Sequence, residues 1–353
     1  MEGLQKEKPQ VYAHAPPCAN TGVDWHLAHT VLGIVRKGHT FLEYRYAWRP
    51  SSPLENPLSR QRNVGFPIHL PCMTFDNIAA QAQDDVRRAL AEDVGSGDLT
   101  AALVPANQRI RAHILAREAA VICGAPWAEA ALRALDPQVQ LTWHVAEGQR
   151  CAPDQVVLEI EGDARALLTA ERTALNFLQL LSGVASKTAQ YVDAVQGTKA
   201  AIVDTRKTLP GLRIAQKYAV KIGGGVNHRI GLYDAVLIKE NHIAAAGGIA
   251  PVLREAEKVA GQARFIEIEV ETLAQLHEAL EAGAKMVLLD NMPLADLRQA
   301  VAINAGRAIL EISGGVTFES LRALAETGVD RISIGVLTKD VKATDFSMRM
   351  QEL

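Results

Sequence analysis

The segment from Arg264 to Gly335 has the sequence "RFIEIEVETLAQLHEALEAGAKMVLLDNMPLADLRQAVAINAGRAILEISGGVTFESLRALAETGVDRISIG". Its short apolar runs "FIEIEV", "KMVLL", "AILEI" and "RISI" alternate with longer segments in which apolar residues recur at helical spacing. One strand and the helix after it take roughly 22 residues, which is typical of repeated strand–helix units. Strands that alternate with helices pair in parallel through right-handed crossovers. The segment therefore predicts an α/β fold built on a parallel sheet.

Two more apolar runs of the same kind lie upstream, "AAIV" at residues 200–203 and "DAVLI" at residues 234–238. Together the runs predict an open (β/α) barrel with about six strands. A doubly wound sheet is the alternative. It is less favoured because no G-x-G-x-x-G turn follows a strand in this sequence.

The chain before Gly197 predicts a small α+β domain. A helix is expected over residues 75–95, because Ile78, Val86 and Leu90 fall on one face and Gly95 follows. Strands are expected within 111–124, 139–148 and 155–162, with a helix over 126–135 between the first two. A long helix from residue 164 to 197 is expected to break near Ser182 and Gly183. The predicted domains are 73–185 and 186–340, with segment 341–353 returning to the first domain.

Residues 1–72 differ from the rest of the chain in composition. They hold eight of the 15 prolines and eight Lys/Arg against five Asp/Glu, whereas the whole chain has a net charge of −3. Much of the segment lacks helical or strand periodicity, so we expect a poorly ordered extension. Two alternatives are a small interaction arm and a true start at Met73, which the intact mass of the native protein would distinguish.

The overall composition argues for a cytoplasmic protein. A net charge of −3 disfavours general binding to nucleic acid or membranes, and no apolar run reaches the roughly 18 residues of a membrane span. No apolar signal core is found near the start of the sequence. The four cysteines form no close-spaced pair, so reduced thiols are expected rather than zinc ligands or disulfides.

Charged and glycine-rich segments follow the predicted barrel strands. Seven Lys/Arg against three Asp/Glu lie between Asp204 and His242. Function in barrels of this kind lies at the carboxyl ends of the strands. Cations there suit a substrate with two carboxylates, acids suit Mg²⁺ and sugar hydroxyls, and glycine backbone suits a phosphate. The residues at the strand ends are Thr205, Arg206, Lys207, Lys239, Glu269, Asp290, Ser313, Gly314, Gly315 and Gly335.

Each of these groups also has a plain structural interpretation. The cations can form a solvated face, "SGG" at Ser313 can be a tight turn, and "GGG" at residues 223–225 can be a flexible turn. His228 can be a hydrogen-bonded structural residue. Glu267, Glu269 and Glu271 alternate along one strand, and we favour Glu269 as functional and Glu271 as a cap of the next helix.

At this point several separated motifs resemble the quinolinate phosphoribosyltransferase family. The resemblance covers about residues 73–353 and rests on "ALAEDVGSGDLTA", "ERTALNFLQLLSGVAS", "DTRKTLPGLR", "QKYAVKIGGGVNHRIGLYDAVLIKENHI", "EIEVETLAQL", "VLLDN", "LEISGGV" and "ETGVDRISIGVLTKDVKATDFSM". It implies an N-terminal α/β-sandwich domain and an open barrel, the type II phosphoribosyltransferase architecture, in a homodimer with shared active sites. It further implies transfer of phosphoribosyl from 5-phosphoribosyl-1-diphosphate to quinolinate with Mg²⁺, giving nicotinate mononucleotide, pyrophosphate and CO2 in de novo NAD synthesis.

The resemblance also implies roles for individual residues. Lys207, Lys239, Glu269 and Asp290 would be catalytic, with Glu269 and Asp290 near the ribose hydroxyls and Mg²⁺. Quinolinate carboxylates would meet Arg206, His228, Arg229 and Lys239, and Arg172 would reach the partner subunit's site. The 5-phosphate would be held by Ser313, Gly314, Gly315, Ile334, Gly335 and Val336.

Three alternatives stay open on the sequence. The same fold could act on another ring acid, such as nicotinate, without decarboxylation. A barrel lyase could use Lys207 or Lys239 as a Schiff-base amine. A non-catalytic metabolite-binding or scaffold protein is the third.

Overall fold

The computed structural model describes residues 31–36, 39–44, 77–261 and 263–352. In the first two of these ranges, β1 (Val31–Arg36) and β2 (His39–Tyr44) pair as an antiparallel hairpin, with Val31 opposite Tyr44. The rest of the predicted extension 1–72, and Met73 with it, lies outside the described residues.

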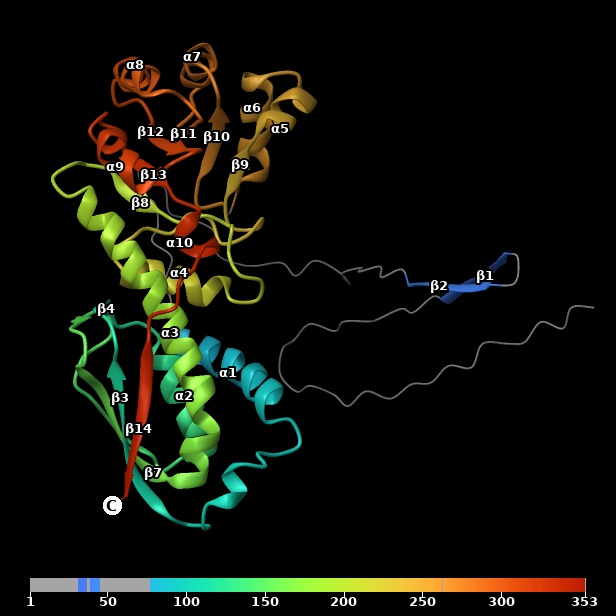
Figure 1. Ribbon diagram of the computed structural model, residues 1–353. Helices are drawn as coiled ribbons and strands as arrows, with labels where there is room; N and C mark the ends of the chain where they lie inside the picture. Colours follow the sequence, from blue (N-terminus) through green and yellow to red (C-terminus); the bar gives the residue numbers. More distant parts are fainter. Residues whose placement is uncertain (1–30, 37–38, 45–76, 262, 353) are drawn as a thin grey trace, which may run out of the picture. The chain divides into compact units, whose positions relative to one another are not determined.

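The N-terminal domain is a four-stranded antiparallel sheet covered by helices (Figure 1). The strand order is β14-β3-β7-β5, so the last strand of the chain lies beside the first strand of this domain. A separate two-stranded sheet pairs β4 with β6. The strands are β3 (Arg109–Ala116), β4 (Ala120–Val121), β5 (Gln140–Trp143), β6 (Arg150–Cys151), β7 (Val156–Asp163) and β14 (Phe346–Glu352).

The helices of this domain are α1 (Ile78–Val94), the 3-10 turn η1 (Ala101–Leu103), α2 (Ala125–Leu135) and α3 (Ala164–Ala194). Helix α1 ends at Gly95, as the sequence predicts, and Gly95 has a positive φ of 53°. Trp127 of α2 is fully buried, and its Nε1 donates to Asp85 of α1 at 2.9 Å. This bond satisfies the indole N–H within the apolar core between the helices.

Helix α3 continues for 31 residues, so the predicted break at Ser182 and Gly183 is wrong. Both residues serve close packing within an unbroken helix. Ser182 Oγ accepts from Cys123 N at 2.9 Å, and a Cβ at Gly183 would collide with the carbonyl oxygen of Lys342. Gly183 therefore lets the connection to β14 cross α3 at short range. The predicted boundary between residues 185 and 186 falls inside this helix.

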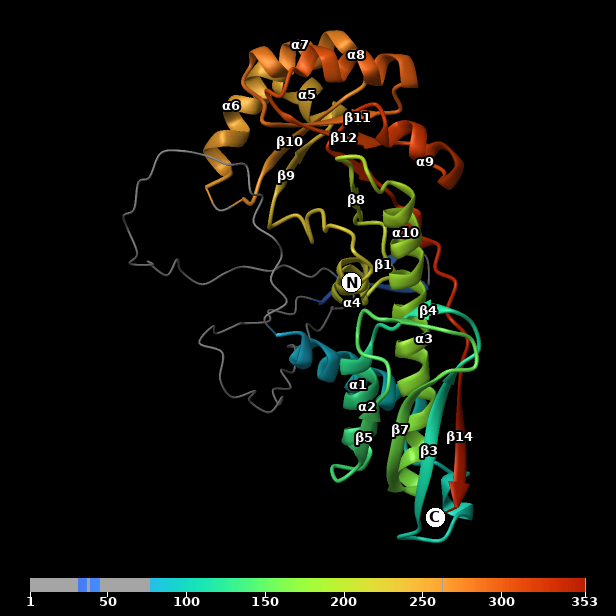
Figure 2. The same cartoon turned by 90° about the vertical axis from the view of Figure 1, so that its left-hand side faces the viewer.

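The second domain is a six-stranded parallel sheet in the order β8-β13-β12-β11-β10-β9. Helices α5 to α9 lie on its outer side (Figures 1 and 2). The strands are β8 (Ala201–Val203), β9 (Val236–Ile238), β10 (Ile266–Val270), β11 (Met286–Asp290), β12 (Ile309–Ser313) and β13 (Arg331–Ser333). The helices are α4 (Arg213–Ile222), α5 (Glu240–Ala246), α6 (Ile249–Val259), α7 (Leu273–Glu281), α8 (Leu294–Asn304), α9 (Phe318–Ala325) and α10 (Val336–Lys339).

The sheet curls without closing on itself. The two edge strands, β8 and β9, are consecutive in the chain and lie at opposite ends of the sheet order, and in the described residues no ladder joins them. A single bridge from Val203 to Val226 extends the β8 edge instead. All six predicted strands are present, and the prediction of an open α/β barrel is confirmed.

The strands of the barrel are apolar because both faces are covered. Ile268, Val287, Leu289 and Ile332 are buried, each exposing under 1% of its surface. Among the described helices, none combines the length and the apolar character needed to cross a membrane.

Candidate active site

A cavity of about 170 Å³ lies at the carboxyl ends of the barrel strands. Its lining combines cations, hydroxyl groups and two leucines from β9 and β11. The lining residues are Thr205, Arg206, Lys207, His228, Arg229, Leu237, Lys239, Leu288, Ser313 and Ser333. Seven of the residues predicted from the sequence are thus brought together around one cavity, and we take it as the candidate active site.

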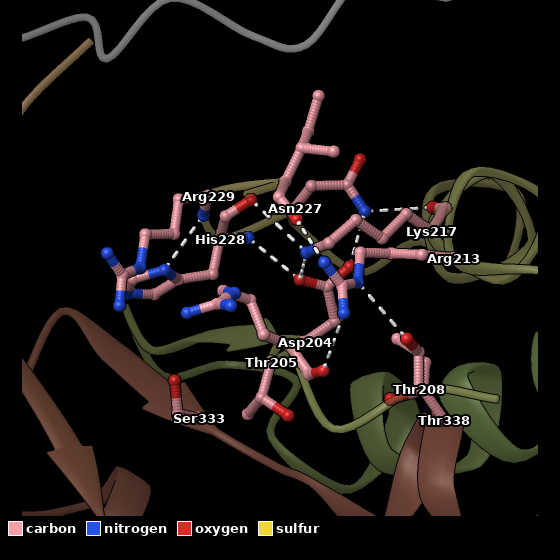
Figure 3. A network of polar contacts seen from close by, with 12 residues as sticks. Asp204, Thr205, Thr208, Arg213, Lys217, Asn227, His228, Arg229, Ser333 and Thr338 are labelled. Carbon is pink, nitrogen blue, oxygen red and sulfur yellow. Dashed lines mark hydrogen bonds and ion pairs between the residues drawn. The ribbon is translucent and has the colours of Figure 1, made fainter. Parts of the chain in front are cut away.

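A buried ion pair beneath the cavity joins the two basic loops. Asp204, which follows β8, bonds to Lys217 of α4, and both side chains are fully buried. The Asp204 carboxylate also accepts from Asn227 Nδ2 at 2.6 Å and from His228 N at 2.9 Å (Figure 3). A buried charge pair is tolerable when its remaining hydrogen-bonding groups are satisfied, as they are here. Asp204 therefore fixes the loop of Arg206 against the loop of His228.

The first basic loop is held by backbone contacts, which leave its side chains to line the cavity. Lys207 N donates to Thr205 Oγ1 at 3.1 Å, and Thr338 Oγ1 donates to the Lys207 carbonyl at 2.8 Å. Arg213 bonds to Thr208 and to the carbonyl oxygens of Arg206 and Ile230 (Figure 3). A Cβ at Gly335 would lie 3.3 Å from Lys207 Cδ, so Gly335 lies directly against the lysine side chain.

Both ring nitrogens of His228 have partners within the protein. Nε2 lies 2.7 Å from Glu267 Oε2, and Nδ1 accepts from the Arg229 backbone N–H at 2.8 Å. Burial disfavours the charged imidazole, but the carboxylates of Glu311 and Glu267 outweigh it and raise the pKa of His228. The contact between His228 and a substrate carboxylate stays a prediction.

Arg229 is crowded by other positive charge. Burial, and then the neighbouring Arg206 guanidinium, lower the pKa of Arg229 below its usual value. Two arginines that repel each other across a cavity favour an anion between them, since the anion relieves the repulsion. The two arginines are therefore suited to bind an acidic ligand.

Sequence reasoning missed two buried glutamates near His228, Glu267 on β10 and Glu311 on β12. Arg331 Nε lies 2.6 Å from Glu311 Oε2, and Ser333 Oγ bonds to the other Glu311 oxygen. Burial, and then the Glu311 charge, raise the pKa of Glu267 to about 7. The available signal was the glutamates inside the apolar runs "FIEIEV", which has two, and "AILEI", which has one, because a buried glutamate requires a partner.

The acidic side of the site lies at the ends of β10 and β11. Lys239 Nζ contacts Glu269 Oε2 at 2.7 Å, and Asn291 Nδ2 donates to Asp290 Oδ2 at 2.8 Å. Both acids are partly exposed at neighbouring parallel strand ends. Carboxylate oxygens at such an edge are the donors that Mg²⁺ takes together with substrate phosphates, so the donor set fits the ion.

The "SGG" turn requires glycine, because Gly314 and Gly315 have φ values of 90° and 59°. A Cβ at Gly314 would also collide with the Asn291 side chain. The "GGG" segment has a different reason. A Cβ at Gly223 would collide with the Ala185 carbonyl of α3, and one at Gly225 would lie 2.9 Å from Thr188. The triplet therefore lets α4 and the loop after it pack tightly on α3.

Two other expectations have different outcomes. The predicted cap at Glu271 is wrong, because Thr272 is the N-cap of α7 and forms a capping box with Gln275. Arg172 is exposed on α3 and is not among the residues that line the cavity of its own chain. Its contact with a partner's site stays a prediction.

Comparison with known proteins agrees with this arrangement. Residues 98–182 match the family model of the quinolinate phosphoribosyl transferase N-terminal domain, and residues 184–349 match that of the C-terminal domain. A probable nicotinate-nucleotide pyrophosphorylase (carboxylating) of Bacillus subtilis is 43% identical over 73% of this chain and 89% of its own length. The corresponding enzyme of Mycobacterium leprae is 44% identical over 76% of this chain and 96% of its own length.

A solved structure gives the same result. The nicotinate-nucleotide pyrophosphorylase of Francisella tularensis superposes with a TM-score of 0.75 at 44% identity, covering 77% of this chain and 97% of that one. These matches span both domains and the cation-lined cavity. The chain therefore belongs to the quinolinate phosphoribosyltransferase family.

Proposed function

We propose that the protein transfers the phosphoribosyl group of 5-phosphoribosyl-1-diphosphate to quinolinate and releases CO2, forming nicotinate mononucleotide and pyrophosphate for de novo NAD synthesis. The observation that carries this proposal is the composition of the cavity. Arg206, Arg229 and Lys239 stand around it, and Leu237 and Leu288 supply its apolar lining. A flat aromatic ring with two carboxylates matches both features.

The cations would bind the two carboxylates from different elements. Arg206 and Lys207 come from the loop after β8, Arg229 from the loop after α4, and Lys239 from the end of β9. Arginine can take a carboxylate in a bidentate pair, whereas lysine supplies a point charge. A ring acid with one carboxylate would leave more of this positive charge uncompensated, which favours a diacid.

Glu269 and Asp290 would hold the ribose hydroxyls and Mg²⁺, and the Gly314–Gly315 and Gly335 backbones would approach the 5-phosphate. When bound, Mg²⁺ would neutralise charge on the pyrophosphate leaving group. The lysine–glutamate contact at Lys239 and Glu269 would place a cation for the acid beside a carboxylate for the sugar. The two substrates would therefore meet at this contact.

The reaction requires the protein to position the two substrates and to stabilise developing charge. The pyridine nitrogen attacks the ribose C1 carbon as the bond to pyrophosphate breaks, and positive charge develops on the ribose. Glu269 and Asp290 would stabilise that charge. The pyridinium so formed accepts the electron pair left when the adjacent carboxylate departs as CO2, and the ring carbon then takes a proton. No side-chain nucleophile is needed.

The assembly is part of the proposal. We infer a homodimer in which Arg172 of one subunit completes the site of the other, as the family resemblance implies. Arg172 is exposed and does not line the cavity of its own chain, which agrees with this role. The cytoplasm is the compartment we propose.

The test is direct. Purified protein is incubated with quinolinate, 5-phosphoribosyl-1-diphosphate and Mg²⁺, with nicotinate as a parallel substrate, and CO2 and nicotinate mononucleotide are followed. Product formed with quinolinate but not with nicotinate supports the proposal. Product only from nicotinate would replace the substrate, and borohydride trapping of a substrate adduct on Lys207 or Lys239 would point to Schiff-base chemistry instead.

A further inference from the structure

His228 connects a buried carboxylate to the backbone of a cavity residue. Its Nε2 lies 2.7 Å from Glu267 Oε2 on one side, and its Nδ1 accepts from the Arg229 N–H at 2.8 Å on the other. Because Nδ1 accepts a hydrogen bond, it carries no proton in the neutral ring, and the ring proton is on Nε2. Glu267 is the nearer of two carboxylates that face this proton, since Glu311 Oε1 lies 3.7 Å from Nε2.

The imidazole is held in place from several directions. Its ring meets Phe265 edge-on, with centroids 5.2 Å apart. Its backbone N–H donates to Asp204, and its carbonyl accepts from Lys217 at 3.2 Å and from Arg264 at 3.3 Å. The backbone contacts fix the loop but leave the ring free to turn about its χ angles. The Arg229 N–H sets the tautomer, and the bond to Glu267 holds the Nε2 side of the ring and with it the ring orientation.

Glu267 makes few other contacts. It is fully buried, and its Oε1 has no hydrogen-bond partner among the described residues. Glu311, the nearest other carboxylate, is already bonded to Arg331 and Ser333. A buried carboxylate with one oxygen unpaired costs free energy. Glu267 can therefore affect the site through its hydrogen bond to His228.

We propose that Glu267 is a positioning residue for the side of the cavity formed by His228 and Arg229. It holds His228 through Nε2, and His228 holds the backbone of Arg229 through Nδ1. This inference rests on the proposed function, in which Arg229 meets a carboxylate of quinolinate. Glu267 itself does not line the cavity. It acts on the acid only through the two residues that do.

A metal ion is the other use for this cluster. Ligand atoms of His228, Glu267 and Glu311 lie within 4.8 Å of one another. However, the Arg331 guanidinium is bonded to the same Glu311 carboxylate at 2.6 Å and would repel a divalent cation. The hydrogen-bonded chain accounts for the observed contacts without an ion.

Kinetics with three variants test the proposal. Glu267→Leu leaves the His228 N–H without an acceptor, and we expect the KM for quinolinate to rise at least ~10-fold, the effect of one unpaired buried donor. The KM for 5-phosphoribosyl-1-diphosphate should change much less. Glu267→Gln keeps an oxygen acceptor and should restore the quinolinate KM to within about threefold of the wild type. The exposed Glu271→Gln, four residues along the chain, is the matched control.

A spectroscopic readout is independent of activity. In the full-length protein labelled with ¹⁵N-histidine, His228 is assigned by the loss of its signal in His228→Gln. We expect an Nε2–H proton protected from solvent exchange in the wild type and in Glu267→Gln, and faster exchange of that proton in Glu267→Leu. Should Glu267→Leu fail to fold, Glu267→Met, of similar length to glutamate, takes its place.

Three results would overturn the proposal: a wild-type quinolinate KM in the apolar variant, equal increases in the KM of both substrates, or an unchanged exchange rate of the His228 Nε2–H proton. Failure of the proposed function has a different signature. A wild-type protein inactive on quinolinate would refute the substrate, while the exchange experiment would still decide whether Glu267 positions His228.

Discussion

Lys239 Nζ and Glu269 Oε2 lie 2.7 Å apart, although the two residues end different strands of the barrel. The pair joins the cation-lined cavity to the acidic edge of β10 and β11, so each half of the site constrains the other. Lys239 exposes 44% of its side chain and Glu269 only 10%, so the lysine is the more accessible of the two to a ligand.

Removing one cavity cation should impair catalysis strongly. We expect Lys239→Ala and Arg206→Ala each to lower kcat/KM by at least ~100-fold, the scale of losing one preorganised charge. Steady-state kinetics with quinolinate measure the effect. Lys258→Ala, an exposed lysine on α6 paired with Glu255, is the control. Near wild-type kinetics in both cavity variants would refute the assignment of the site.

Shared active sites predict complementation between inactive subunits. Mixed dimers of Arg172→Ala and Lys239→Ala protomers contain one site that carries neither substitution, if Arg172 acts across the dimer. We expect such mixtures to regain part of the wild-type activity, whereas each parent alone stays inactive. Absence of rescue in mixed dimers verified by mass spectrometry would show that each site draws on one chain.

The Gly314 turn should tolerate no side chain. Gly314→Ala places a methyl group against Asn291, which bonds to Asp290 at 2.8 Å, in a backbone conformation with φ of 90°. We expect the KM for 5-phosphoribosyl-1-diphosphate to rise more than the KM for quinolinate. Gly306→Ala is the matched control, because Gly306 has a φ of 79° with no atom within 4 Å of its added Cβ. Equal kinetic effects of both substitutions would mean that backbone strain alone is responsible.

The buried pair beneath the site should contribute to the stability of the fold. Lys217→Met leaves the fully buried Asp204 carboxylate without its cation, which costs about 3–5 kcal/mol of unfolding free energy. Adding Asp204→Asn removes the unpaired charge, so we expect the double variant to be more stable than Lys217→Met alone. Chemical denaturation of the wild type, the two single variants and the double variant measures this. Strictly additive losses would show that the two side chains do not interact.

The barrel could be predicted because each of its strands is recognisable from a short local stretch of sequence. A parallel strand covered on both faces needs a short apolar run, and a helix of regular period follows each one. Strand order then places Lys239, Glu269, Asp290 and Ser313 at one edge. The prediction of these strand ends therefore needed no knowledge of distant contacts.

The errors concern residues whose reason lies far away in the sequence. Gly183 suggested a helix break, but it serves the passage of Lys342, about 160 positions later. The "GGG" segment suggested a flexible turn, but its lack of side chains allows close packing against α3. Glu267 and Glu311 stand out only as carboxylates within apolar runs, and the runs do not identify their partners His228 and Arg331, which come from other elements. Local periodicity carries no information on such pairs.

Helix α3, about 46 Å long at 1.5 Å per residue, packs against α2 and β7 of one domain and against α4, β8 and α9 of the other. The boundary between the two matched family domains, at residues 182–184, therefore cuts a continuous helix. A protein expressed as two fragments at that point would divide this common axis and part β3 from its neighbour β14. Neither fragment would keep all of its own core, so we expect the two domains to unfold as one cooperative unit.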